Sequence, residues 1–204
     1  MQSSSEINTI SKRAVKASGY TWGIAEDVGK SISSIEMFGI AGVKNLTSYL
    51  KLIRNNKPEG PKEIKRENYL NGKNLCPIYT GIKLIDDYQL VDETKSLYFL
   101  NVDYPLLLLP FVSRLSYLIG KRVVVAIDQI KVECNLNICI LADHQIKSLV
   151  IQKADTFSIN IIENLDSFSS ETWNELYEMS SETFVEETER LKNTAAGAGL
   201  QDND

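Results

Sequence analysis

The apolar positions in the first quarter of the chain recur at helical intervals. Ser3 and Glu6 have the spacing of a capping box, and the apolar residues that follow them repeat every three or four positions. Thr21 can cap a second helix that ends near Gly39. The pattern predicts three amphipathic helices, over about 4–18, from Thr21 to Gly39, and over about 41–54.

A surface connection follows these helices. Residues 55–67 contain two prolines, one glycine and seven charged side chains, which is typical of an exposed loop. We expect the connection to run from residue 57 to residue 74.

The hydrophobic pattern changes at residue 75. Runs rich in β-branched and aromatic residues predict strands, and Ile130 to Cys134 alternate as a half-buried antiparallel strand does. The predicted strands lie within residues 77–85, 96–102, 122–141, 146–152 and 157–162. The apolar run over residues 105–119 has helical spacing and predicts a buried helix.

A near repeat marks the C-terminal part. "SSETW" begins at Ser169 and "SSETF" at Ser180, and each supplies a serine cap followed by glutamate. Either the second copy starts a new element, or one helix continues to Lys192. A small, Gly-rich acidic tail then closes the sequence from residue 193 to residue 204.

These elements predict an α+β fold. We expect an N-terminal three-helix bundle packed beside a mainly antiparallel sheet, with a C-terminal helix leading to the tail. The predicted parts are a helical subdomain at 1–56, the connection at 57–74, the sheet-containing region at 75–192 and the tail at 193–204, together forming one compact domain.

Composition and charge restrict the partners. The hydrophobic content of 43% and the charged content of 24% are those of an ordinary globular protein. Residues 1–75 contain 12 Lys/Arg and 7 Asp/Glu, whereas the whole chain has a net charge of -5. This acidic balance argues against nucleic acid as the main partner. Pro110 and Arg114 interrupt the longest apolar stretch, residues 104–120, so we expect no membrane span.

The cysteines and the N-terminus indicate a cytoplasmic protein. The three cysteines are odd in number, and Cys134 and Cys139 lack C-x-x-C spacing, so we expect reduced thiols in a reducing compartment. The first fifteen residues have no apolar segment after a basic start, unlike a secretory signal.

No complete catalytic, metal-binding or nucleotide-binding signature is present. His144 is the sole histidine, and it follows Asp143 between two strand-like runs; an exposed turn histidine is favoured over a general base. The motifs of zinc sites and of phosphate-binding loops are missing, so the sequence predicts no metal and no cofactor.

Two places are candidates for binding. Tyr20 and Trp22 lie in a turn between helices, where exposed aromatic side chains contact a ligand or a partner, although anchoring of the turn in the core competes with this interpretation. The tail offers Gly197 and Gly199, followed by the polar group Asp202, Asn203 and Asp204, and a frayed terminus is the alternative there.

Both ends of the chain resemble a known family. The opening "INTISKRAVKASGYTWGIAEDVGKSISSIEMFGIAGV" and the ending "TFVEETERLKNTAAGAGLQDND" resemble those of a bacterial family of uncharacterised proteins, domain of unknown function 3726. The resemblance carries no activity. It implies that the Gly-rich acidic ending is used, and it implies an extended segment at residues 183–185.

Two functions follow as expectations. The first is a small-molecule-binding or partner-binding accessory protein of metabolism that uses its C-terminal tail and contacts a partner enzyme or forms a homo-oligomer. The second is a carboxylate-dependent metabolic enzyme, with or without a divalent cation, in which Asp202, Asp204 and Asp27 or Glu26 line a pocket.

Overall fold

The computed structural model describes residues 2–56, 58–135, 138–141, 146 and 148–183. The chain divides into two compact units, Met1–Asn164 and Leu165–Asp204, and each is described by itself. The finer boundaries expected from the sequence stay a prediction.

Three helices open the first unit, as the hydrophobic pattern predicted. They are α1 (Ser4–Ala17), α2 (Trp22–Met37) and α3 (Gly42–Leu52), and a short 3-10 turn, η1 (Ile53–Asn55), extends α3. The capping box is formed, because the Glu6 amide donates to Ser3 Oγ at 3.1 Å and the Ser3 amide donates to Glu6 Oε2 at 3.1 Å. Thr21 caps α2 by accepting from the Ile24 amide.

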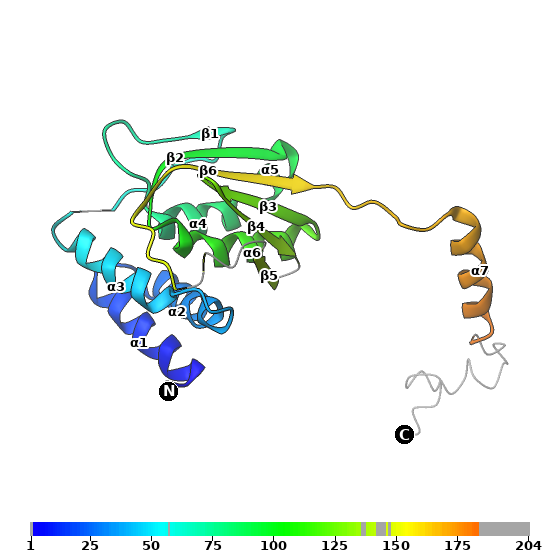
Figure 1. The fold of residues 1–204 in the computed structure, drawn as a ribbon, viewed down its shortest axis with the longest axis horizontal. Helices are drawn as coiled ribbons and strands as arrows, with labels where there is room; N and C mark the ends of the chain where they lie inside the picture. Colours follow the sequence, from blue (N-terminus) through cyan, green and yellow to red (C-terminus); the bar gives the residue numbers. More distant parts are fainter. Residues whose placement is uncertain (1, 57, 136–137, 142–145, 147, 184–204) are drawn as a thin grey trace, which may run out of the picture. The chain divides into compact units, whose positions relative to one another are not determined.

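A six-stranded sheet forms the other half of this unit (Figure 1). Its strands are β1 (Glu67–Asn68), β2 (Ser96–Asp103), β3 (Arg122–Ile127), β4 (Ile130–Asn135), β5 (Ile138–Leu141) and β6 (Lys153–Ile162). They are ordered β1-β2-β6-β3-β4-β5. Strand β1 runs parallel to β2, and every other pair is antiparallel. The prediction of an α+β fold with a mainly antiparallel sheet is confirmed.

Helices pack on one face of this sheet. Figure 1 shows α4 (Pro77–Asp86) and α6 (Leu109–Ile119) together on the same side of the strands. Inward-facing residues of β2 and β6, such as Phe99 and Phe157, are buried, whereas Tyr98 and Leu100 point away from the helices and are exposed. The 3-10 turn η2 (Pro105–Leu108) leads into α6, and the short α5 (Tyr88–Thr94) precedes β2. The helix predicted over residues 105–119 is therefore confirmed.

Two predicted strands are wrong. Residues 77–85 form α4, because Pro77 occupies its first turn, Cys76 caps it, and Ile78, Gly81 and Leu84 are buried at helical spacing, which overrides the β-propensity of the isoleucines.

The described residues of 146–152 form no strand either. Their backbone turns toward the helical bundle, since the Ser148 amide donates to Gly39 O at 3.4 Å and Asn45 Nδ2 donates to Leu149 O at 2.9 Å. These hydrogen bonds take the place of a strand ladder.

The second unit contains α7 (Ser170–Ser181), which begins at the predicted serine cap, Ser169. The helix ends at Ser181, within the second repeat, which favours a break at this repeat over one unbroken helix to Lys192. Residues 184–204 lie outside the described part, and with them the predicted tail and two of the three residues of the predicted extended segment; the third, Thr183, lies in a turn. No helix among the described residues is long and apolar enough to cross a membrane.

Candidate functional site

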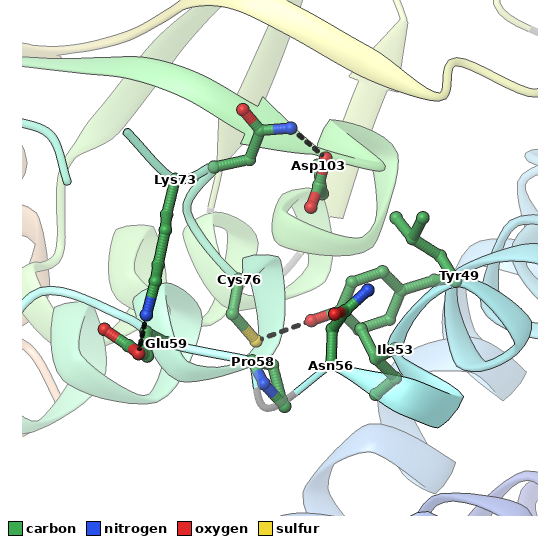
Figure 2. Close-up of a pocket in the computed structure, with 10 residues that line it drawn as sticks. Tyr49, Ile53, Asn56, Pro58, Glu59, Lys73, Cys76 and Asp103 are labelled. Carbon is green, nitrogen blue, oxygen red and sulfur yellow. Dashed lines mark hydrogen bonds and ion pairs between the residues drawn. The ribbon is translucent and has the colours of Figure 1, made fainter. Parts of the chain in front are cut away.

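A pocket of about 370 Å³ lies between the end of α3, the loop after η1, the segment before α4 and the end of β2 (Figure 2). This volume falls at the small end of the range of small-molecule sites. One wall is apolar and is made by Tyr49, Leu52, Ile53 and Pro58. The remainder carries charged and amide side chains from segments far apart in the sequence.

Backbone hydrogen bonds bring these segments together. The Leu75 amide donates to Asn101 O at 2.7 Å, and the Asp103 amide donates to Leu75 O at 3.0 Å, so the segment before α4 runs alongside the end of β2. The Cys76 amide donates to Glu59 O at 2.8 Å and holds the loop against the same segment. These bonds place Asn74 beside Asp103 in the pocket wall.

Two residues with left-handed backbone conformation flank Asp103. Asn101 has φ 56° and Tyr104 has φ 42°. Such a conformation is uncommon for asparagine and rare for tyrosine, and it costs about 1–3 kcal/mol where the surroundings enforce it. Strain of this kind concentrates at ligand sites, so two instances within four residues single out this end of β2.

The Asp103 carboxylate has a neutral partner. Asn74 Nδ2 donates to its Oδ1 at 2.8 Å. Lys153 stands opposite Asp103 across the β2–β6 pair, but its ammonium pairs with Asp155 at 3.3 Å. Within the described residues, no cationic group lies at ion-pair distance from Asp103.

Burial determines how Asp103 titrates. Desolvation raises the pKa of this carboxyl above its usual range, and the Asn74 hydrogen bond and the Lys153 charge only partly oppose it. Figure 2 shows the carboxyl at one end of the pocket. The site therefore presents a carboxylate that gains from an added hydrogen-bond donor or cation.

A second part of the pocket wall, away from Asp103, carries a pair of opposite charges. Lys73 Nζ forms an ion pair with Glu59, and both side chains are about half exposed. An exposed pair of this kind contributes little to stability, so the Lys73 ammonium can turn toward a bound molecule at low cost.

Cys76 forms the floor between these groups, where Tyr49 Oη donates to its Sγ at 2.9 Å. The Tyr20 hydroxyl lies 3.4 Å from the same sulfur and 3.3 Å from the Tyr49 hydroxyl. The sulfur also accepts from the Tyr79 amide at 3.3 Å, as the cap of α4.

This environment keeps the thiol protonated. Burial raises the pKa of Cys76, and the hydrogen bonds from Tyr20 and Tyr49 offset this only in part. The thiolate is the nucleophilic form, so the protonated Cys76 side chain suits capping of α4 rather than attack on a substrate.

The structure separates the two aromatic residues singled out in the sequence. Tyr20 is 1% exposed, and its ring packs 5.1 Å from that of Tyr79 in the core. Trp22 is 59% exposed, and the Lys16 ammonium lies 5.6 Å from its ring centroid. Tyr20 thus reaches the floor of the pocket only through Cys76 and Tyr49. A binding role for either residue stays a prediction.

The other predicted site residues do not enter the pocket or lie outside the described part. Asp27 pairs with Arg114 at 3.2 Å, Glu26 pairs with Lys30 at 3.2 Å, and neither borders the pocket. Asp143 and His144 are not among the described residues, nor are Gly197, Gly199, Asp202, Asn203 and Asp204. No group of three or more potential metal ligands occurs in the ranges that the structure describes.

Sequence reasoning missed Asp103, Asn74, Lys73 and Glu59. One local signal was available, because Asp103 follows the strand pattern "SLYFLNV" directly and precedes "YP", and polar residues at strand ends often carry function. Nothing in the sequence joined that position to the loop and to the segment before α4.

The comparisons with known proteins agree with the resemblance drawn from the sequence. The matched segment, residues 2–86, runs from the start of the helical bundle to the end of α4 and includes every pocket residue except Asp103. No curated protein matches the chain. The model of the family described as "Protein of unknown function (DUF3726)" matches the chain over residues 2–86.

Proposed function

We propose that this chain is a small-molecule-binding accessory protein of metabolism in the bacterial cytoplasm, and that its ligand carries a cationic amino group bound by Asp103. The observation that carries the proposal is the partly buried Asp103 carboxylate in the pocket wall, whose side-chain partner at hydrogen-bond distance is the neutral Asn74 amide.

An ammonium group complements this carboxylate. A charge-assisted hydrogen bond is about twice as strong as a neutral one, and it returns to Asp103 the stabilisation lost on burial. The apolar wall of Tyr49, Leu52 and Ile53 takes an alkyl or aromatic portion of the same ligand. Asn56 and Lys73 also line the pocket and can contact polar substituents.

Binding is favoured over catalysis at this site. The pocket thiol is held in its protonated form. The other carboxylate among the described pocket residues, Glu59, is paired with Lys73. The carboxylate-dependent enzyme remains the alternative, and turnover of a bound amine would support it.

A thermal unfolding screen tests the proposal. The probes are matched pairs that differ in charge, such as benzylamine with benzyl alcohol and amino acids with the corresponding 2-hydroxy acids. A ligand at a hundred times its dissociation constant stabilises the native state by about 2.7 kcal/mol. We expect amines to raise the midpoint of the wild-type protein and their hydroxyl counterparts, which lack the ammonium group, to leave it unchanged.

Two Asp-to-Asn variants locate the effect. Asp103→Asn should abolish the shift, whereas Asp86→Asn, an exposed carboxylate outside the pocket, should retain it. Equal shifts with amines and alcohols, or an amine shift that persists in Asp103→Asn, would refute the assignment.

The contribution expected of the tail is tested separately. A chain truncated after Lys192 lacks Gly197 to Asp204 and keeps the whole pocket. Loss of the amine shift on truncation would support a role of the tail in ligand binding, and an unchanged shift would exclude one.

A further inference from the structure

Helix α7 presents large apolar side chains to solvent along its length. None of its twelve residues is buried. Trp173, Leu176 and Tyr177 are 52%, 58% and 62% exposed. These three occupy positions i, i+3 and i+4 and therefore form one ridge on the helix, the spacing by which amphipathic helices anchor in a groove.

The helix is prepared for such a contact at its N-terminus. Ser169 Oγ accepts from the Thr172 amide at 3.2 Å. Phe168 precedes this cap, and its ring stacks on Trp173 with 5.5 Å between centroids. Phe168 and Trp173 hold the positions of a hydrophobic staple, so the first turn and the orientation of Trp173 are fixed before any partner arrives.

The charges segregate to the opposite face. Glu171, Glu175, Glu178 and Glu182 lie about 140–200° around the helix from Trp173, at roughly 100° per residue. Residues 165–183 include Asp166 as a fifth acidic residue and no Lys or Arg. The like-charged pairs at i, i+4 destabilise a free helix, and twelve residues are marginal for one alone.

The acidic character of α7 indicates which kind of partner binds the ridge. Interfacial helices that bind lipid carry Lys and Arg on their polar face, so an acidic helix is poorly suited to an anionic membrane. Pairing of two identical α7 helices brings together two segments of the same strongly acidic character. A protein surface with an apolar groove bordered by cationic side chains would bury the apolar ridge and pair with the acidic face of α7.

We propose that α7 is a docking helix, which inserts the ridge of Trp173, Leu176 and Tyr177 into an apolar groove, bordered by Lys or Arg, on a partner protein. The docking helix is independent of the pocket at Asp103, so either proposal can fail alone.

Site-specific photocrosslinking in the full chain tests this docking. A photoreactive phenylalanine derivative is placed at Leu176 on the ridge or, as the matched control, at Glu175 on the acidic face, in cells of the native host. We expect a discrete protein adduct from position 176 and a much weaker one from position 175. The adducted protein is identified by mass spectrometry and purified, and its affinity for the unmodified chain is measured.

Variants then decide the mode of binding. Leu176→Ala should weaken the purified complex at least tenfold, while alanine preserves the helix because it is the best helix former. Raising the salt concentration should weaken the complex further. The proposal is overturned if positions 175 and 176 give the same adducts or none, if the adduct is a second copy of this chain, if vesicles of phosphatidylglycerol bind the chain through Leu176, or if Leu176→Ala leaves the affinity unchanged.

Discussion

Replacement of Gly81 by alanine tests the packing that holds the pocket segment in place. Gly81 is buried in α4, where an added Cβ would lie 2.4 Å from two ring atoms of Phe111 in α6 and 2.9 Å from Phe111 Cβ. Carbon atoms in contact are normally about 3.5–4.0 Å apart, so the two helices must separate or the ring must move.

Two effects of opposite sign set the magnitude. Alanine gains about 1 kcal/mol over glycine in a helix interior. Overpacking of a well-filled core costs typically about 1–3 kcal/mol. The expected change in the free energy of unfolding therefore lies between no change and a loss of about 2 kcal/mol.

A second glycine provides the matched control. Gly23, near the start of α2, has no atom of another described segment within 4 Å of its added Cβ. Gly23→Ala should raise the free energy of unfolding by about 0.5–1 kcal/mol through backbone entropy alone. The difference between the two variants isolates the overpacking cost, which we expect to be about 1–3 kcal/mol.

Urea denaturation followed by circular dichroism measures both values. Phe111→Leu in the Gly81→Ala background removes part of the ring and should restore stability relative to the sum of the single changes. If Gly81→Ala stabilises the protein as much as Gly23→Ala does, the close approach of α4 and α6 is wrong.

Three further predictions concern the core around the pocket. Tyr49→Phe removes the hydroxyl that donates to Cys76 Sγ and should lower the free energy of unfolding by about 1 kcal/mol, as measured by urea denaturation. An unchanged value would show that this hydrogen bond does not stabilise the fold. Thr80→Val replaces a buried hydroxyl that has no hydrogen-bond partner within the described part of the chain, so the same assay should show a gain of about 1 kcal/mol, and a loss would contradict the packing of α4. Because burial raises the pKa of Cys76, iodoacetamide should label this residue in native protein far more slowly than in urea-unfolded protein, as followed by peptide mass spectrometry; rapid native labelling would indicate an accessible thiolate.

The helical bundle was predictable because its signals are local. Ser3, Glu6 and Thr21 act within three residues of their own position, and the apolar spacing of α1 to α3 needs no knowledge of distant segments. Strands β2, β3, β4 and β6 were found for the same reason. The segment 77–85 was mispredicted because its isoleucines favour strand, whereas the Cys76 cap and the contact of Gly81 with Phe111 decide for helix.

The pocket depends on contacts that no local pattern contains. Asp103 meets Asn74 because Leu75 hydrogen-bonds to Asn101 and Asp103, and the left-handed turns at Asn101 and Tyr104 shape that end of β2. These residues are about thirty positions apart, so periodicity in a short window cannot relate them. The sequence drew attention instead to Tyr20, whose hydroxyl lies within the core beneath the pocket.

The effect of Asp103→Asn on stability has a definite sign. Burial raises the pKa of Asp103 in the folded state above its unfolded value, so the ionised carboxylate carries a penalty that is present above the folded pKa and is relieved as the pH falls through it. The neutral amide that Asp103→Asn introduces avoids this penalty at neutral pH and keeps an oxygen to accept from Asn74. The variant should therefore be at least as stable as the wild type, and loss of binding in it would not reflect unfolding.

The most direct test of the central claim is calorimetric titration of the wild-type chain with the amine that gives the largest thermal shift, repeated as the pH is lowered. The amine stays protonated throughout, whereas protons compete with it for the Asp103 carboxylate. We predict that the dissociation constant rises as the pH falls through the raised pKa of Asp103, approaching tenfold per pH unit below it, and that Asp103→Asn binds weakly at every pH. An affinity that stays constant with pH, or that survives in Asp103→Asn, would contradict the assignment of this pocket to a cationic ligand.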